Sequence, residues 1–181
     1  MIHLDAVRIQ LPLKRKFVVS RGEATVKTNL LTILNNRYSG EASTSVYYGP
    51  SIEEMAADLQ KGIDLLNQQT TITPETMQTI DRLNIHPANR SALMGATINY
   101  LSGESRRYPW EVLNLGTPIG IKSSITVGID STEEMIKAIR GSEFGIIKVK
   151  VGNEADIMIL DAIDPSLGKE IRVDANGAWS C

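Results

Sequence analysis

Two short runs decide how this chain folds: Ile146-Ile147-Lys148-Val149-Lys150-Val151 and, further along, Ile171-Arg172-Val173-Asp174. Both are short and rich in β-branched residues, as buried strands are. Most of the residues between them predict a helix from Asn153 to Ile163, so the runs form a βαβ unit whose strands pair in parallel. Lys150 and Asp174 then stand at neighbouring carboxyl ends of strands, where ligand sites form in α/β sheets.

The same alternation begins earlier, near Thr117-Pro118. Residues 124–129 predict a strand, and Ser131-Thr132-Glu133-Glu134 is a capping box that starts a helix ending at Arg140. Three strands with two intervening helices give βαβαβ, so we expect a parallel sheet with right-handed crossovers.

The first part of the chain predicts a small antiparallel meander. Apolar residues alternate from Ile2 to Ala6 and then change phase from Val7 to Leu11, which suggests a bulge or bend. A second strand is predicted over 26–34, a turn over 35–40 and a returning strand over 41–46.

Three helices follow in the prediction. Ser51 and Glu54 form a capping box at the start of a helix with an apolar stripe that ends near Leu66. Thr73-Pro74 starts a second helix, to about Leu83, and a third spans about 87–101. A three-stranded sheet with a helical cluster makes a compact α+β domain.

Composition excludes several classes of function. The chain of 181 residues has a formal net charge of -2, which does not favour a nucleic-acid partner. No run approaches the roughly 18 apolar residues of a membrane span, and the N-terminus does not resemble a signal peptide. The single cysteine fits a reducing compartment. We expect a cytoplasmic protein without a membrane or nucleic-acid partner.

Lys148 and Lys150 lie two positions apart, so they share one face of their strand. If that face is enclosed, a desolvated lysine can serve as a base near neutral pH. The alternative is an exposed edge strand, where lysines commonly prevent aggregation. The pair alone favours the edge.

Asp174 shifts the balance toward a functional site. A carboxylate at the end of a parallel strand is a natural oxygen ligand for Mg²⁺. The alternative is an aspartate that caps a helix or sits in a loop. Arg21 and the Tyr47-Tyr48 pair are weaker candidates: an arginine in a loop can clamp a carboxylate, and the tyrosines could line a pocket.

Taken together, five segments resemble the enolase superfamily, and within it the muconate-lactonising-enzyme-like branch that includes dipeptide epimerases. They are Gly40-Glu41-Ala42, Pro109-Trp110-Glu111-Val112-Leu113-Asn114-Leu115-Gly116, Ser124-Ile125-Thr126-Val127-Gly128, Ile147-Lys148-Val149-Lys150-Val151-Gly152 and Arg172-Val173-Asp174-Ala175-Asn176-Gly177-Ala178-Trp179-Ser180. The last two are the most specific. The resemblance implies an α+β capping domain over 1–116 and, over 117–181, the first βαβαβ units of a modified TIM (β/α) barrel.

The resemblance also implies a chemistry: abstraction of the proton alpha to a carboxylate, with Mg²⁺ stabilising the charge that develops. Lys150 would be the acid/base, and Lys148 would assist it and pair with the substrate carboxylate. Asp174 would be the first of three metal carboxylates, with Asn176 as a supporting polar group.

For the substrate, the resemblance implies a dipeptide or acyl amino acid. Arg21, Tyr47, Tyr48 and Thr126 would be contacts beside Lys148. The complete enzyme would form a homo-oligomer.

The resemblance covers the N-terminal portion of such an enzyme. The other two metal carboxylates and the lysine of the opposite face would lie beyond Cys181. We therefore expect weak or absent Mg²⁺ binding and no epimerase activity from this chain alone. Two alternatives remain: a related o-succinylbenzoate synthase or muconate cycloisomerase, and a non-catalytic remnant that needs a partner chain.

Overall fold

The computed structural model describes residues 2–20, 22–43 and 49–179. Its internal contacts divide the chain into two compact units. The first comprises Met1–Leu11 and Val26–Pro118, and the second comprises Pro12–Thr25 and Ile119–Cys181. The predicted domain ranges 1–116 and 117–181 stay a prediction. The grouping of residues 12–25 with the second unit was not anticipated.

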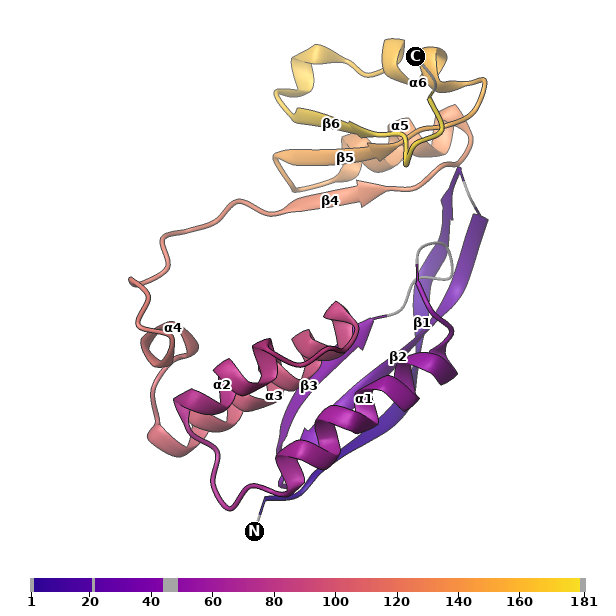
Figure 1. Cartoon of the computed structure of the whole chain (residues 1–181). Helices are drawn as coiled ribbons and strands as arrows, with labels where there is room; N and C mark the ends of the chain where they lie inside the picture. Colours follow the sequence, from indigo (N-terminus) through magenta and orange to yellow (C-terminus); the bar gives the residue numbers. More distant parts are fainter. Residues whose placement is uncertain (1, 21, 44–48, 180–181) are drawn as a thin grey trace. The chain divides into compact units, whose positions relative to one another are not determined.

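A three-stranded sheet has the order β1 (Leu4–Val19), β2 (Gly22–Leu34) and β3 (Tyr38–Ser43) (Figure 1). β2 and β3 are antiparallel, with Leu34 opposite Tyr38. The returning strand starts three residues earlier than predicted because Asn35 and Asn36 both adopt left-handed φ angles, 52° and 55°. Asparagine tolerates this conformation, so the turn is short. Residues 44–46 of the predicted strand lie outside the described residues.

The change of phase in the first strand, from which we predicted a bulge or bend, coincides with a change in burial. β1 is continuous, and Ile2 and Leu4 are buried, whereas Val7 and Leu11 are exposed at 40% and 39%. The reason is that the core of the first unit includes no residue of β1 beyond Ala6.

Helices supply the other side of the core of the first unit. They are α1 (Ile52–Asn67), α2 (Pro74–Asp81) and α3 (Pro87–Ser105). The short α4 (Pro109–Val112) follows them and buries no residue. The capping box predicted at Ser51 is confirmed: its Oγ accepts from the Glu54 amide at 3.2 Å, and its own amide donates to Glu54 Oε2 at 2.8 Å. Both exchanges satisfy amides that the first helical turn leaves unpaired.

Strand β3 and helix α3 approach each other at Gly40. A Cβ atom placed on Gly40 would lie 1.9 Å from the Ala92 carbonyl oxygen and 2.7 Å from the Ala96 nitrogen. Beside this contact, Thr32 Oγ1 is 3.0 Å from the Gly40 carbonyl oxygen and 3.2 Å from that of Ala92. Close backbone packing, rather than turn geometry, therefore requires glycine here.

The second unit contains the predicted βαβαβ arrangement, which is confirmed. Its elements are β4 (Ser124–Val127), α5 (Thr132–Gly141), β5 (Ile146–Lys150), α6 (Asp156–Asp161), the 3-10 turn η1 (Pro165–Leu167) and β6 (Glu170–Asp174). The three strands are parallel in the order β4-β5-β6 (Figure 1). Helix α6 is shorter than the predicted span 153–163. It begins only at Asp156, whose carboxylate accepts from the backbone of the preceding turn.

Alternation along β5 gives its two faces different roles. Ile147, Val149 and Val151 are fully buried in a core with Met135 and Ile139 of α5, and Ile159 of α6 joins them. Successive strand residues point to opposite faces, so Lys148 and Lys150 face away from this core.

The tip of the β1–β2 hairpin is bonded to the loops of the second unit. The Ile129 amide donates to the Val18 carbonyl at 3.1 Å, and Ser20 Oγ donates to the Ala175 carbonyl at 3.3 Å. Residues 12–25 are thus bonded to the loops that follow β4 and β6.

Within the part of the chain that the structure describes, no helix is long and apolar enough to cross a membrane.

The contact at Gly40 predicts a specific sensitivity to added volume. Gly40→Ala places a methyl group against backbone atoms of α3, and overpacking of this kind costs roughly 1–3 kcal/mol. Urea unfolding of the purified chain should show that loss in the free energy of unfolding. Gly116→Ala is the matched control, since a Cβ there meets nothing within 4 Å. Equal stability of the two variants would contradict the packing argument.

Candidate functional site

The site is built where β5 and β6 end. Lys150 is the last residue of β5 and Asp174 the last of β6, and the parallel register pairs them directly. Lys150 Nζ donates to Asp174 Oδ2 at 2.6 Å and to Asn176 Oδ1 at 2.9 Å. The Lys150 residue is only 6% exposed. Such a buried ammonium needs its carboxylate partner, because an unpaired buried charge is strongly destabilising.

Lys148 stands on the same face, closer to solvent. Its Nζ lies 3.7 Å from Asp174 Oδ2, and its side chain is 39% exposed, against 8% for Lys150. One carboxylate oxygen therefore faces two ammonium groups. β5 is the middle strand of its sheet, so the alternative that these lysines guard a sheet edge is wrong.

Asp174 is held from both sides. Besides its lysine partners, its Oδ1 accepts the Asn176 amide at 3.0 Å, within a turn where Asn176 and Gly177 take φ angles of 50° and 73°. The Lys150 hydrogen bond, followed by the Asn176 amide, holds the pKa of Asp174 below its ordinary value. Among the described residues no helix begins at Asp174, so the carboxylate serves the turn and the lysines rather than a helix cap.

The remaining predicted contacts fall into two groups. Thr126 of β4 is opposite Lys148 in the register, and Arg172 of β6 flanks Lys148 on the other side. Paired residues of a parallel sheet share a face, which puts Thr126 beside the lysines. Arg21 and the Tyr47-Tyr48 pair lie outside the described residues, and their roles stay predictions.

The Asp174 carboxylate fits one ligand position of a magnesium site. It is an oxygen donor at a strand end, and its lowered pKa keeps it ionised. Among the described residues, however, no group of three or more His, Cys, Asp or Glu side chains could hold a metal ion. The described residues thus provide part of such a site and not a complete one.

Sequence analysis missed Asp156. This carboxylate is buried and accepts the Trp179 indole Nε1–H at 2.7 Å and the Gly152 amide at 2.9 Å. An aspartate four positions after a strand-end glycine carries no distinctive signal, because the same spacing occurs at ordinary helix starts.

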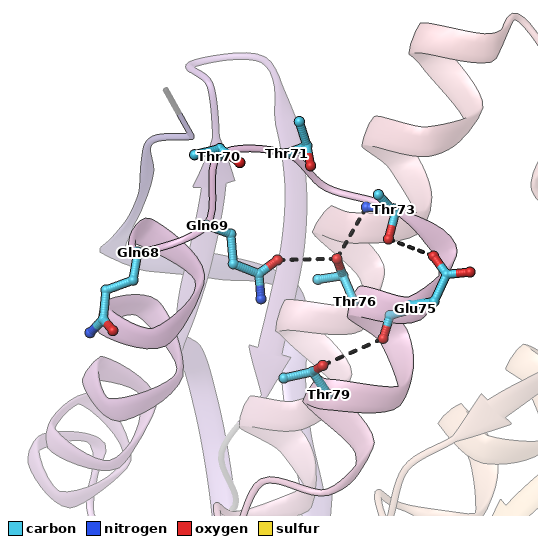
Figure 2. A pocket seen from close by; sticks show the side chains of 8 residues that line it. All are labelled: Gln68, Gln69, Thr70, Thr71, Thr73, Glu75, Thr76 and Thr79. Carbon is cyan, nitrogen blue, oxygen red and sulfur yellow. Dashed lines mark hydrogen bonds between the residues drawn. The ribbon is translucent and has the colours of Figure 1, made fainter.

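The first unit has a polar hollow of about 420 Å³ at the start of α2 (Figure 2). Its side chains bond mainly to one another: Thr76 Oγ1 to Gln69 Oε1 at 3.2 Å, and Thr73 Oγ1 to Glu75 Oε2 at 2.6 Å. The Thr73 amide also donates to Thr76 Oγ1. These hydrogen bonds complete the cap of α2, so Gln69, Thr73, Glu75 and Thr76 are already engaged with one another.

No family model matches the chain. In sequence it is 26% identical over 178 residues to the L-Ala-D/L-amino acid epimerase of Flavobacterium johnsoniae, and the match covers 93% of this chain and 52% of that protein. The chain thus spans about half the length of the curated relative.

Solved structures share the fold. An enolase family member from Agrobacterium tumefaciens with homology to dipeptide epimerases has a TM-score of 0.85 at 22% identity, over 99% of this chain and 55% of its own. A dipeptide epimerase from Enterococcus faecalis, complexed with Mg and L-Leu-L-Tyr, has a TM-score of 0.84 at 19% identity, over 98% and 54%. A muconate lactonizing enzyme from Pseudomonas fluorescens has a TM-score of 0.79 at 20% identity, and the match covers 99% of this chain and 54% of that enzyme.

The chain therefore has the fold of the N-terminal half of an enolase-superfamily enzyme: the capping domain followed by the first strands of the barrel. This confirms the fold class expected from the sequence. The curated relatives that it matches are two L-Ala-D/L-amino acid epimerases and an L-Ala-D/L-Glu epimerase, which confirms the resemblance to that branch.

The paired carboxylate predicts a pH-dependent contribution to stability. Because the pKa of Asp174 is lower in the folded chain than its ordinary value of 3.8, ionised Asp174 stabilises the fold fully above that value. This stabilisation is lost as the pH falls through the lower folded pKa. The stability gap between wild type and Asp174→Asn should therefore be constant from about pH 7 to about pH 5 and shrink as the pH falls below about 4.

Urea unfolding across that pH range measures the gap. Asp161→Asn is the matched control, because it removes an exposed carboxylate from the same unit, and its unfolding should follow the wild-type curve. A gap between wild type and Asp174→Asn that is constant with pH would show that the pairing with Lys150 does not depend on ionised Asp174.

Proposed function

We propose that this chain supplies the first part of the active site of a Mg²⁺-dependent epimerase that abstracts the proton alpha to a carboxylate. The observation that carries the proposal is the convergence of Lys148, Lys150 and Asp174 at neighbouring ends of parallel strands. Charged groups of both signs, held at the edge where ligand sites form, suit proton transfer beside an anionic substrate.

In this proposal Lys150 Nζ moves the proton. Its burial among fixed partners keeps the amine in one place, and positioned acid/base groups of this kind typically accelerate proton transfer by 10²–10⁴-fold. Lys148 is more exposed and can meet an incoming carboxylate, which would orient the substrate carbon toward its neighbour. Thr126, beside Lys148, would add a hydrogen bond to the same group.

Asp174 would hold the metal. A bound Mg²⁺ would supply positive charge beside the substrate carboxylate, where negative charge grows as the proton leaves. The carboxylate already carries the negative charge that such an ion requires. Further ligands and the base for the opposite face would come from outside the described residues.

The proposed substrate is a dipeptide or an acyl amino acid. The epimerase of F. johnsoniae acts on L-Ala-D/L-amino acids, and the structure from E. faecalis holds Mg with L-Leu-L-Tyr. Arg21, Tyr47 and Tyr48 remain the proposed specificity contacts. A homo-oligomer and a cytoplasmic location belong to the same proposal.

A second candidate is a cycloisomerase or an o-succinylbenzoate synthase. The specific observation in its favour is the fold shared with the muconate lactonizing enzyme of P. fluorescens, which was solved with muconolactone. The two candidates would use the same lysine pair and aspartate. They differ in substrate, because an epimerase must also accommodate the amino-acid nitrogen.

The test is exchange of the α-proton in D₂O, followed by NMR. L-Ala-L-Glu is incubated with Mg²⁺ and the longest product of the reading frame that contains this chain. We expect deuterium at the carbon beside the terminal carboxylate, and we expect EDTA to abolish the exchange. Lys150→Gln should slow it by roughly a hundredfold or more. Lys122→Gln, an exposed lysine of the same unit, is the control.

The 181-residue chain alone is the second arm, for which we expect no exchange. Exchange by this chain would mean that the described residues suffice for catalysis. A longer product that ignores dipeptides but converts a muconate or the o-succinylbenzoate precursor would replace the epimerase by the second candidate.

A further inference from the structure

The carboxylate of Asp156 joins two separate segments of the second unit. Its Oδ1 and Oδ2 both accept the Gly152 amide at 2.9 Å, and Oδ1 also accepts the Asn153 amide at 3.1 Å. Oδ2 accepts the Trp179 indole N–H at 2.7 Å. Gly152 and Asn153 belong to the turn after β5, whereas Trp179 belongs to the loop after β6. We call these four residues the Asp156 latch.

The latch is built around a buried charge. Burial would raise the pKa of Asp156, but the Gly152 amide, the Trp179 indole and the Asn153 amide outweigh it and lower the pKa. The carboxylate therefore stays ionised inside the protein, held by neutral donors. A buried carboxylate is costly unless its oxygens are satisfied, so losing any one donor weakens the whole arrangement.

Each side of the latch lies close in sequence to a proposed site residue. Gly152 follows Lys150 by two positions, and Trp179 belongs to the loop that Asp174 and Asn176 begin. Between them, the Val151 amide donates to the Asp174 carbonyl at 3.2 Å. The latch therefore closes the strand pairing at the end where Lys150 meets Asp174.

Gly152 is closely packed against two other segments of the second unit. Its φ angle is +132°, and a Cβ there would lie 2.6 Å from Ser20 Cβ and 2.9 Å from Ala178 Cβ. The hairpin tip, the turn after β5 and the loop after β6 thus meet at one point. Only glycine adopts this backbone without strain at such a close approach.

Hydrophobic burial accounts only in part for the place of Trp179. The residue is 55% exposed and borders an open hollow of about 580 Å³ with Ile157 and Leu160. More than half of its surface stays in water, so it gains only part of the hydrophobic free energy of a buried tryptophan. Its fixed polar contact is the hydrogen bond to Asp156.

We propose that Asp156 is a positioning residue: it ties the turn after β5 to the loop after β6 and so holds Lys150 against Asp174. Its importance for catalysis rests on the proposed function, whereas the tie itself is a property of the folded chain. The two can therefore be tested separately.

The first measurement asks whether the hydrogen bond exists. Trp110→Phe leaves Trp179 as the only tryptophan, so one indole N–H signal appears in the ¹H–¹⁵N NMR spectrum. In that background, Asp156→Asn should shift the indole proton upfield and speed exchange of the Gly152 amide roughly tenfold or more. Asp161→Asn, the same change at the exposed end of α6, should leave both unchanged.

The second measurement asks whether the latch positions Lys150. Limited acetylation followed by mass spectrometry gives the labelling rate of each lysine, with the exposed Lys148 on the same strand as reference. Asp156→Asn should raise the rate of Lys150 relative to Lys148 by roughly tenfold or more. A general loss of stability would speed both lysines, and Asp161→Asn should change neither.

The outcomes separate the possibilities. An unchanged indole signal would overturn the latch, and a lost hydrogen bond with an unchanged Lys150:Lys148 ratio would overturn the positioning role. If Asp156→Asn does not fold, Trp179→Phe removes one donor and should raise the same ratio by a smaller factor. A dipeptide assay without α-proton exchange would count against the proposed function only, because neither measurement involves turnover.

Discussion

The ion pair between Lys150 and Asp174 is the constraint around which the second unit is arranged. The parallel register of β5 and β6 sets the two residues side by side, and the 2.6 Å contact satisfies a lysine that is almost fully buried. A shift of one residue would turn every side chain of a strand to the other face. The lysine would then enter the apolar core without its carboxylate, so the charge pairing and the strand register support each other.

One strand carries both the stability and the candidate chemistry of this unit. Ile147 and Val149 of β5 are fully buried against α5, while Lys148 and Lys150 alternate with them on the opposite face. The apolar residues make the strand rigid, and a rigid strand is the best support for side chains that must hold a precise geometry. Proposed site residues and core residues are therefore neighbours in sequence.

Much of the fold was predictable because its signals are local. The capping box of Ser51 and Glu54 depends on a few adjacent residues. The strand that ends at Lys150 is rich in β-branched residues, which predict a strand without reference to distant parts of the chain. The early start of β3 was not predictable in the same way, because two consecutive left-handed asparagines are one of several turns that the sequence permits.

The candidate site was predictable only in part, for a related reason. Lys150 and Asp174 stand at strand ends, and the βαβ pattern alone brings strand ends together. Asp156 acquires its role from Trp179, which lies 23 positions away and meets it only in the folded chain. The grouping of the hairpin tip with the second unit depends on an even longer separation, and no local pattern records it.

That long separation has a consequence for the order of folding. Ser20 and Ala175, which are joined by a hydrogen bond, are 155 positions apart. Contacts between such distant residues form late, because the entropy of closing a long loop must be lost before the contact contributes. During synthesis the hairpin tip is made early. Its bond to Ile129 becomes possible once β4 has emerged, whereas its bond to Ala175 must await β6. We therefore expect the docking of the tip to be completed only after β6 has emerged.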